Sequence, residues 1–150
     1  MTRYAENTDV PTDRSRAEIE HTLKRYGADQ FMYGTKSDFA MIAFRASGRN
    51  VRFSVPFPPL SDFERTKKGL RHEAKHREAA REQAIKQRWR ALALCIKAKL
   101  EAVACGITQF EEEFYAHIVL PNGRTVFEET HEKVALAYES GKMPPLLPHF

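Results

Sequence analysis

The chain has 150 residues, of which 42% are hydrophobic and 29% charged, with 24 Lys or Arg against 20 Asp or Glu. This length is typical of one domain, and such a chain buries about 68–70% of its unfolded surface without a disulfide or metal. No stretch approaches the roughly 18 apolar residues of a membrane span, and the polar start lacks a signal-peptide pattern. We therefore expect one cytoplasmic, non-membrane domain over residues 1–150, with flexible tails at 1–13 and 142–150.

The first half of the chain predicts a helix followed by three strands. Ser15 and Glu18 have the spacing of a capping box, and apolar residues follow at helical spacing up to Gly27. Alternating or continuous apolar residues then predict strands at 31–33, 39–44 and 51–55. Turn residues at 47–50 pair the last two strands as a hairpin.

A long helix is predicted from about residue 71 to 104, because this stretch contains no Gly or Pro and is rich in helix-forming residues. One apolar stripe along it should cover the apolar face of the hairpin. The stripe comprises Ile85, Trp89, Leu92, Ile96, Leu100 and Val103. Cys95 is expected to be buried and inert, and Cys105 to be the more accessible thiol.

Two shorter helices complete the prediction, one from about 108 to 118 and one from 125 to 140 that Gly141 ends. The fold class is therefore α+β. It consists of a short N-terminal helix, a three-stranded antiparallel sheet with a hairpin, a long basic amphipathic helix packed on that sheet, and two shorter C-terminal helices.

The positive charge is concentrated in the middle of the chain. Residues 62–106 hold twelve Lys or Arg against six Asp or Glu, whereas residues 107–150 hold three against seven. Cations flank both sides of the long helix's apolar stripe, which fits a phosphate-binding strip, although an ordinary solvated face has the same composition. The predicted nucleic-acid-binding residues are Lys67, Lys68, Arg71, Lys75, Arg77, Arg81, Arg88 and Lys99, with Arg45, Arg49 and Arg52 of the hairpin completing the groove.

Aromatic side chains fall into two predicted groups. Rings in strongly apolar patterns are expected in the core, namely Phe39, Phe44, Phe53 and Trp89. Other rings are candidates for stacking on single-stranded bases, namely Phe31, Tyr33, Phe57 and Phe63.

His72, Glu73 and His76 form an HExxH match, the pattern in which two imidazoles one helical turn apart bind zinc and the Glu activates water. Arg71, Lys75 and Arg77 surround it with positive charge that opposes a metal cation. We therefore interpret the match as coincidental and expect no metal and no cofactor. A small zinc metallopeptidase remains the third functional hypothesis.

Three segments of the chain carry a resemblance to a known family: RSRAEIEHTLKRYGA, KQRWRALALCIKAKLEAVACGITQFEEEFYAHIVLPNGRT and AYESGKMPPLLP. Together they resemble an uncharacterised family of bacteriophage and prophage proteins, which implies an accessory role in phage replication, recombination or anti-defence. The element order over residues 15–104 is also similar to double-stranded-RNA-binding domains and to strand-annealing recombination proteins. The first similarity implies that Lys67, Lys68, Arg71 and Lys75, at the start of the last helix, contact phosphates.

The leading hypothesis is a non-enzymatic nucleic-acid-binding accessory protein in the cytoplasm of a bacterial host, with DNA favoured over RNA. The sequence does not decide between single-stranded and double-stranded nucleic acid, because contacts to phosphates are the same in kind for both. The second hypothesis is a phage-encoded inhibitor that binds a host or defence protein. A homo-oligomer is also expected, because Ala91, Leu94 and Ala98 give the long helix a second apolar line and the acidic C-terminal third complements its basic face.

Overall fold

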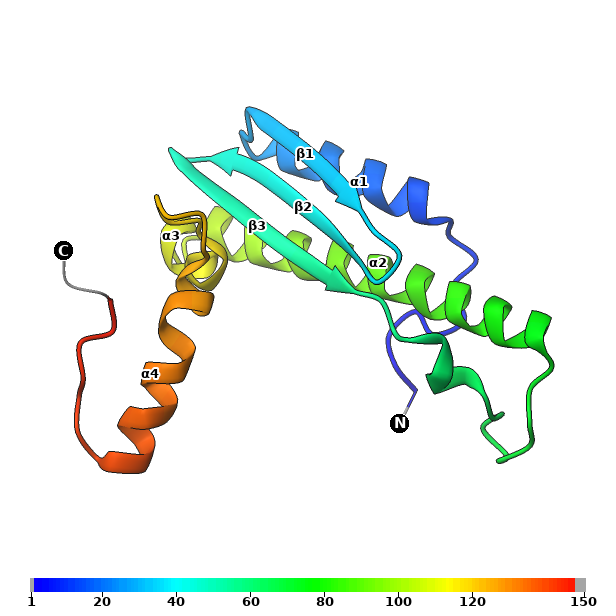
Figure 1. Ribbon diagram of the computed structural model, residues 1–150. Helices are drawn as coiled ribbons and strands as arrows, with labels where there is room; N and C mark the ends of the chain where they lie inside the picture. The colour runs from blue at the N-terminus through cyan, green and yellow to red at the C-terminus, as the bar shows by residue number, and fades with distance from the viewer. Residues whose placement is uncertain (1, 148–150) are drawn as a thin grey trace.

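The computed structural model describes residues 2–147 and has an α+β architecture, which confirms the predicted fold class (Figure 1). Two short 3-10 helices, Leu60–Phe63 and Tyr115–His117, interrupt the connecting segments. The regular elements in chain order are α1 (Thr12–Arg25), β1 (Gln30–Thr35), β2 (Phe39–Ala46), β3 (Arg49–Pro56), α2 (Ala74–Ala104), α3 (Phe110–Glu113) and α4 (Val126–Ser140).

The three strands form one antiparallel sheet in the order β1-β2-β3. In the centre of the register, Ile42 of β2 pairs with Tyr33 on one side and Phe53 on the other. The hairpin between β2 and β3 turns at Ser47 and Gly48, whose φ values of 51° and 73° both lie in the left-handed region. A type I′ turn requires this geometry at both central residues and matches the twist of the strands, so the predicted hairpin is confirmed.

Helices α1 and α2 cover one face of the sheet (Figure 1). The predicted stripe of α2 faces the sheet, where Trp89, Ile96 and Leu100 are buried. The Trp89 side chain is 0% exposed, and its ring centroid lies 5.6 Å from that of Tyr33. Hydrophobic burial of this kind, which removes apolar area from water at about 25 cal/mol per Å², is the main force that holds the two layers together.

The N-terminal segment differs from its prediction. Helix α1 begins at Thr12 after Pro11, so the capping box predicted at Ser15 is wrong: Ser15 is buried inside the helix, and its hydroxyl has no partner within residues 2–147. The segment before α1, expected to be a flexible tail, runs along α2. Gln83 Nε2 donates to the carbonyl oxygens of Glu6 and Thr8 at 3.2 and 2.8 Å. Gln87 Nε2 donates to the Tyr4 carbonyl at 2.8 Å.

Cys95 lies on the side of α2 that faces away from the sheet and is exposed, so its predicted burial is wrong. The apolar neighbours Leu94 and Ile96 suggested the core, but only Ile96 points at the sheet. Successive helical residues are separated by about 100° around the axis, which puts neighbours in sequence on different faces. Cys105 is exposed, as expected.

The helix predicted over 108–118 is much shorter in the structure. It ends after Glu113, and Phe114 is buried with its ring edge-on to Phe44 and Phe53 at centroid distances of 5.8 and 6.2 Å. The chain then leaves the helical path so that Ile118 can pair with Val51 beside the free edge of β3. Tertiary pairing therefore overrides local helix propensity in this segment.

Helix α4 matches its prediction in both bounds. Thr125 and Glu128 form a capping box at its start, and Gly141 ends it with φ 69°. Unlike α1 and α2, α4 projects away from the sheet and contains no buried residue (Figure 1). Its Phe127 and Tyr138 side chains are 57% and 88% exposed.

Within residues 2–147, no helix has the length and apolar run needed to cross a membrane.

Candidate nucleic-acid interface

The N-terminal end of α2 and the loop before it project beyond the sheet (Figure 1) and carry the first group of predicted cations. Lys68, Arg71 and Lys75 are exposed, and none of their side chains forms an ion pair or hydrogen bond with any residue of the described chain. Arg65, their neighbour, donates to the Gly69 carbonyl at 3.1 Å and is also exposed. We call Arg65, Lys68, Arg71 and Lys75 the basic end.

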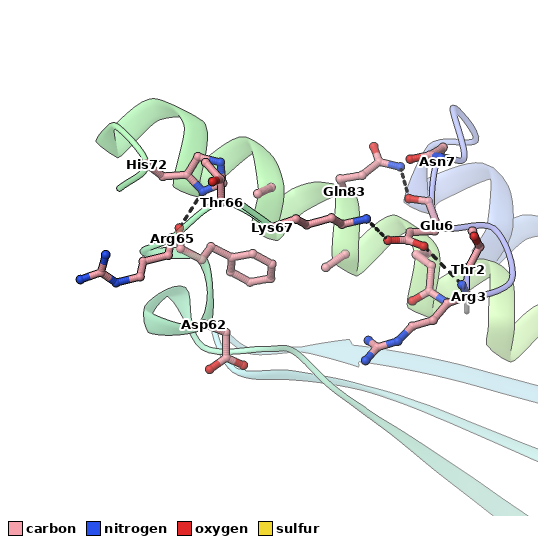
Figure 2. A pocket seen from close by; sticks show the side chains of 14 residues that line it. Thr2, Arg3, Glu6, Asn7, Asp62, Arg65, Thr66, Lys67, His72 and Gln83 are labelled. Carbon is pink, nitrogen blue, oxygen red and sulfur yellow. Dashed lines mark hydrogen bonds and ion pairs between the residues drawn. The ribbon is translucent and has the colours of Figure 1, made fainter. Parts of the chain in front are cut away.

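Lys67 lies in the same loop but is paired. Its ammonium bonds to the Glu6 carboxylate, which joins the loop to the N-terminal segment (Figure 2). The Lys67 hydrogen bond, with a second from the Arg3 backbone N–H, holds the pKa of Glu6 below its usual value. Because Lys67 is 88% exposed, this ion pair is open to solvent and contributes little to stability.

The next cations along α2 are used inside the fold. Arg81 donates from Nε to the Pro58 carbonyl at 2.9 Å and from Nη2 to the Ser37 carbonyl at 2.7 Å. Arg88 donates to the Pro56 carbonyl. These bonds fasten α2 to the segments that enter β2 and leave β3. Arg77 is half-buried, and its Nε has no partner within residues 2–147.

Lys99, near the other end of α2, is also used internally. Its ammonium donates to the Glu113 backbone oxygen at 3.1 Å and to the Glu113 carboxylate at 3.3 Å. It lies 5.8 Å from the centroid of the Phe114 ring. Lys99 therefore connects α2 to α3 and is less available for a phosphate than the exposed cations.

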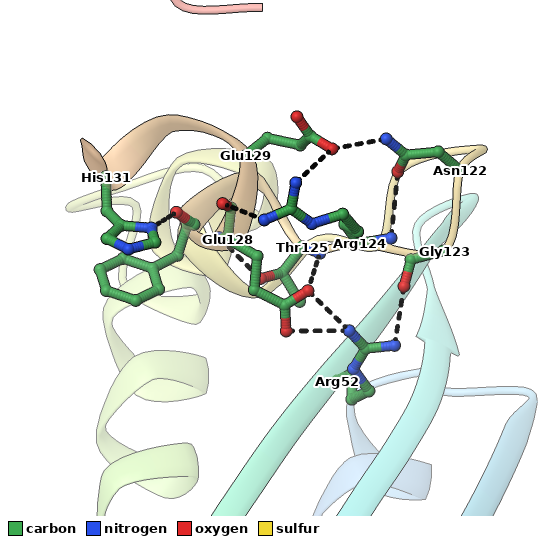
Figure 3. Close-up of polar contacts among 9 residues, drawn as sticks. Arg52, Asn122, Gly123, Arg124, Thr125, Glu128, Glu129 and His131 are labelled. Carbon is green, nitrogen blue, oxygen red and sulfur yellow. Dashed lines mark hydrogen bonds and ion pairs between the residues drawn. The ribbon is translucent and has the colours of Figure 1, made fainter. Parts of the chain in front are cut away.

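Two of the three hairpin arginines bind acidic residues of the C-terminal segment. Arg49 pairs with Glu111 at 3.3 Å. Arg52 donates to both carboxylate oxygens of Glu128 at 3.1 Å and to the Gly123 carbonyl at 3.0 Å (Figure 3). Burial alone would raise the pKa of Glu128, but the Thr125 N–H and the Arg52 guanidinium hold it below its usual value. Arg45 is exposed and makes no such bond within the described residues.

The structure does not bring all eleven predicted residues into one groove. Arg45 and Arg49 flank the β2–β3 turn, where β3 begins, and Arg52 lies three residues further along β3, whereas the basic end follows the other end of β3. An eight-residue strand spans about 26 Å at 3.3 Å per residue, which separates the two groups. The basic end is thus the part of the predicted strip that remains open to a ligand.

The HExxH match does not form one helical turn. Glu73 is the N-cap of α2, so His72 precedes the helix and only His76 lies within it. The His72 Nδ1 is 2.9 Å from the Phe63 carbonyl oxygen, and the two imidazole centroids are 6.4 Å apart. Within residues 2–147, no three His, Cys, Asp or Glu side chains gather as a metal site.

Of the four rings predicted to stack on bases, three pack against the hydrophobic core: Phe31, Tyr33 and Phe57. The Arg16 guanidinium also covers Tyr33 at 4.3 Å from its centroid. Phe63 is the exception, because it lies in the loop of the basic end and is half-buried there. It is the one ring of this group placed beside the exposed cations.

Comparison with protein-family models, with curated proteins and with solved structures finds no match to this chain. The assignment of function therefore depends on the placement of the residues described above.

His117 gives the fold a predicted pH dependence. Its imidazole stacks on Phe53 at a centroid distance of 4.0 Å, and burial, aided by the Lys99 charge, lowers its pKa from 6.5. The folded chain thus binds this proton less readily than the unfolded chain, so stability falls as pH drops through about 6.5. We expect a lower free energy of unfolding by urea at about pH 5.5 than at about pH 7.5.

The matched variants for this prediction are His117→Phe, which keeps a ring against Phe53, and His21→Gln at an exposed position. His117→Phe should flatten the pH dependence, and His21→Gln should leave it unchanged. The carboxyl groups with lowered pKa have an unfolded value of 4.5 and titrate below this window. An equal pH dependence in His117→Phe and the parent chain would contradict the assignment.

Proposed function

We propose that this chain is a non-enzymatic nucleic-acid-binding protein that holds a phosphate backbone, DNA by preference, at the basic end. The observation that carries the proposal is the set of exposed cations at this end, Lys68, Arg71 and Lys75, which have no ionic partner in the described chain. The other predicted cations are largely committed to carbonyl and carboxylate partners. From the resemblance to phage proteins we further propose an accessory role in phage replication, recombination or anti-defence.

Two further features of this end favour an anion. Between residues 64 and 78 the chain carries six Lys or Arg and three Glu. The N-terminus of α2 points into the same region, and Glu73 makes no side-chain cap bond to its first backbone N–H groups. Uncapped N–H groups and the positive end of the helix dipole attract phosphate, and cations without partners exchange their counterions for phosphate readily.

The test is fluorescence anisotropy with a labelled oligonucleotide over a salt series. The variant Lys68→Gln, Arg71→Gln, Lys75→Gln removes three charges at the basic end. We expect weaker binding at low salt. We also expect the salt slope, the slope of log binding constant against log salt concentration, to fall in magnitude by about 2 to 3, since each phosphate contact contributes about 0.9.

The control variant Arg14→Gln, Arg25→Gln, Lys97→Gln removes the same charge from α1 and the far half of α2. These three side chains are exposed and form no ion pair or hydrogen bond with another described residue. The salt slope of this control variant should stay close to that of the parent chain. Equal losses in both variants would show a diffuse charge effect, and no binding by the parent chain at low salt would refute the proposal.

A second candidate function, binding to another protein, is favoured by helix α4. Phe127, Val134 and Tyr138 lie along one side of this helix at spacings of seven and four, and all three are exposed. An amphipathic helix normally buries such a stripe, and an exposed apolar patch typically marks an interaction site. Absence of nucleic-acid binding would make this the leading candidate.

A further inference from the structure

A cavity of about 750 Å³ lies beside the basic end, between the N-terminal segment, the loop that precedes α2, and α2 itself (Figure 2). Its walls come from residues far apart in sequence, which fall within residues 2–7 and 62–72 and on one side of α2 at Ala80, Gln83, Ala84 and Gln87. Ligand-binding cavities typically enclose about 300–1,000 Å³. This cavity is therefore large enough for a small organic group such as a nucleotide base.

The lining combines three kinds of side chain. Ala80 and Ala84 give it a small apolar surface, and Phe63 gives it an aromatic ring. Hydroxyl and amide groups come from Thr2, Asn7, Thr66, Gln83 and Gln87. The amide nitrogens of Gln83 and Gln87 are bonded to the N-terminal segment, so the hydroxyl groups and the Asn7 amide are the donors that face a ligand. A flat aromatic group with hydrogen-bonding edges, as every nucleic-acid base is, matches a ring and such polar groups together.

The charges in the wall favour a neutral group inside the cavity. The lining contains three cations, Arg3, Arg65 and Lys67, and two acidic residues, Glu6 and Asp62, and Lys67 already pairs with Glu6 (Figure 2). A phosphate beside Lys67 would lie close to the Glu6 carboxylate. The Arg65 guanidinium instead points away from the cavity, toward the outside of the loop (Figure 2).

The walls are held in place by the contacts of α2. The amide nitrogens of Gln83 and Gln87 bind the carbonyls of the N-terminal segment, and Lys67 and Glu6 join that segment to the loop. The His72 ring, bonded to the Phe63 carbonyl, fixes the loop on the other side. The cavity is thus built by named contacts, which reduces the ordering that a ligand must impose.

We propose that this cavity accepts one unstacked base of a single-stranded nucleic acid while the basic end holds the adjoining phosphates. The inference rests on the proposed function and adds strand form to it. A base that is paired and stacked in a duplex has no free face or edge to offer, so single strands should bind better than duplexes. Phe63 is the residue expected to stack on the base.

The experiment compares two single-stranded oligonucleotides of about ten nucleotides, a common site size for such binding. One carries adenine bases, and the other carries abasic spacers on the same phosphate backbone. We expect the parent chain to bind the base-containing strand roughly five- to 150-fold more tightly, the range that one stacked base supplies. A duplex of equal length should bind more weakly than the base-containing single strand.

Two variants locate the effect. Phe63→Leu removes the ring and Ala80→Leu fills the cavity, and either should bring the two strands to similar affinity. Phe127→Leu, which removes an exposed ring on α4, should leave the difference intact. Because the strand comparison is made on the parent chain, it gives a result even where a variant does not fold.

The outcomes separate the two proposals. Equal binding of both strands by the parent chain would refute the base site and leave phosphate binding at the basic end in place. A base preference that survives in both Phe63→Leu and Ala80→Leu would also refute this cavity as the site. Failure of the parent chain to bind either strand would refute both proposals.

Discussion

Replacing Trp89 by alanine is expected to lower the free energy of unfolding by about 3–5 kcal/mol, the range for removing a large buried aromatic side chain. Trp89 is fully buried where α2 lies on the sheet, beside the ring of Tyr33. Its indole N–H is buried without a partner in the described chain, so the ring stabilises the fold by packing and not by a hydrogen bond. Urea unfolding followed by far-ultraviolet circular dichroism measures the loss.

Two control variants accompany Trp89→Ala. Trp89→Phe should cost clearly less, because it keeps an aromatic ring and removes the unpaired N–H. Tyr138→Ala, at an 88% exposed position, should change stability by no more than about 0.5 kcal/mol. A loss of similar size in Trp89→Ala and Tyr138→Ala would contradict the described core.

Arg81→Ala is expected to lower the free energy of unfolding by about 1.5–3 kcal/mol, the range for hydrogen bonds to a charged group. The substitution removes both bonds to the Ser37 and Pro58 carbonyls, which fasten α2 to the sheet. The salt slope of nucleic-acid binding should stay unchanged under conditions where the variant is folded. Urea unfolding and anisotropy on the same preparation measure the two effects.

Arg71→Ala provides the matched comparison, because it also removes one arginine from the predicted strip. Arg71 is exposed and makes no side-chain bond within residues 2–147. Its loss should leave stability within about 0.5 kcal/mol and reduce the salt slope by about one. If Arg81→Ala instead reduces the slope and leaves stability intact, Arg81 belongs to the interface and its structural role is refuted.

The fold could be predicted largely from the sequence because periodic patterns report which faces of an element are buried. The alternation of Val51, Phe53 and Val55 identified a strand with one buried face, and these three residues are buried. The spacing of Trp89, Ile96 and Leu100 identified the side of α2 that meets the sheet. Turn chemistry at Ser47 and Gly48 identified the hairpin, because few residues adopt a positive φ readily.

The partners of the charged side chains could not be predicted, because a helical wheel gives a direction but not the neighbour that lies there. Arg81 and Arg88 point toward carbonyls at the sheet's end, which only the three-dimensional fold brings within reach. The cavity was missed for a related reason. The segment that forms one wall was expected to be a tail, and its contacts with Gln83 and Gln87 join residues more than 70 positions apart.

The HExxH match shows how far a motif depends on its context. The pattern predicts two imidazoles on one helical face only where all five residues are helical. Here α2 begins at Ala74, inside the motif, and His72 belongs to the loop. The positive charge of Arg71, Lys75 and Arg77 around the match suits an anion better than a metal cation.

The absence of buried side chains in α4 affects the rate at which its backbone amides exchange with solvent deuterium. Amide protons of α1, α2 and the sheet are protected by the common core, so their slowest exchange with solvent deuterium requires global unfolding. Beyond the first turn the α4 amides lack this protection, since Val126 packs against the core and Thr125, Glu128 and Arg52 make polar contacts only at that turn. In the isolated chain α4 should therefore exchange as a separate, faster unit, and its slowing would report directly that a partner has covered it.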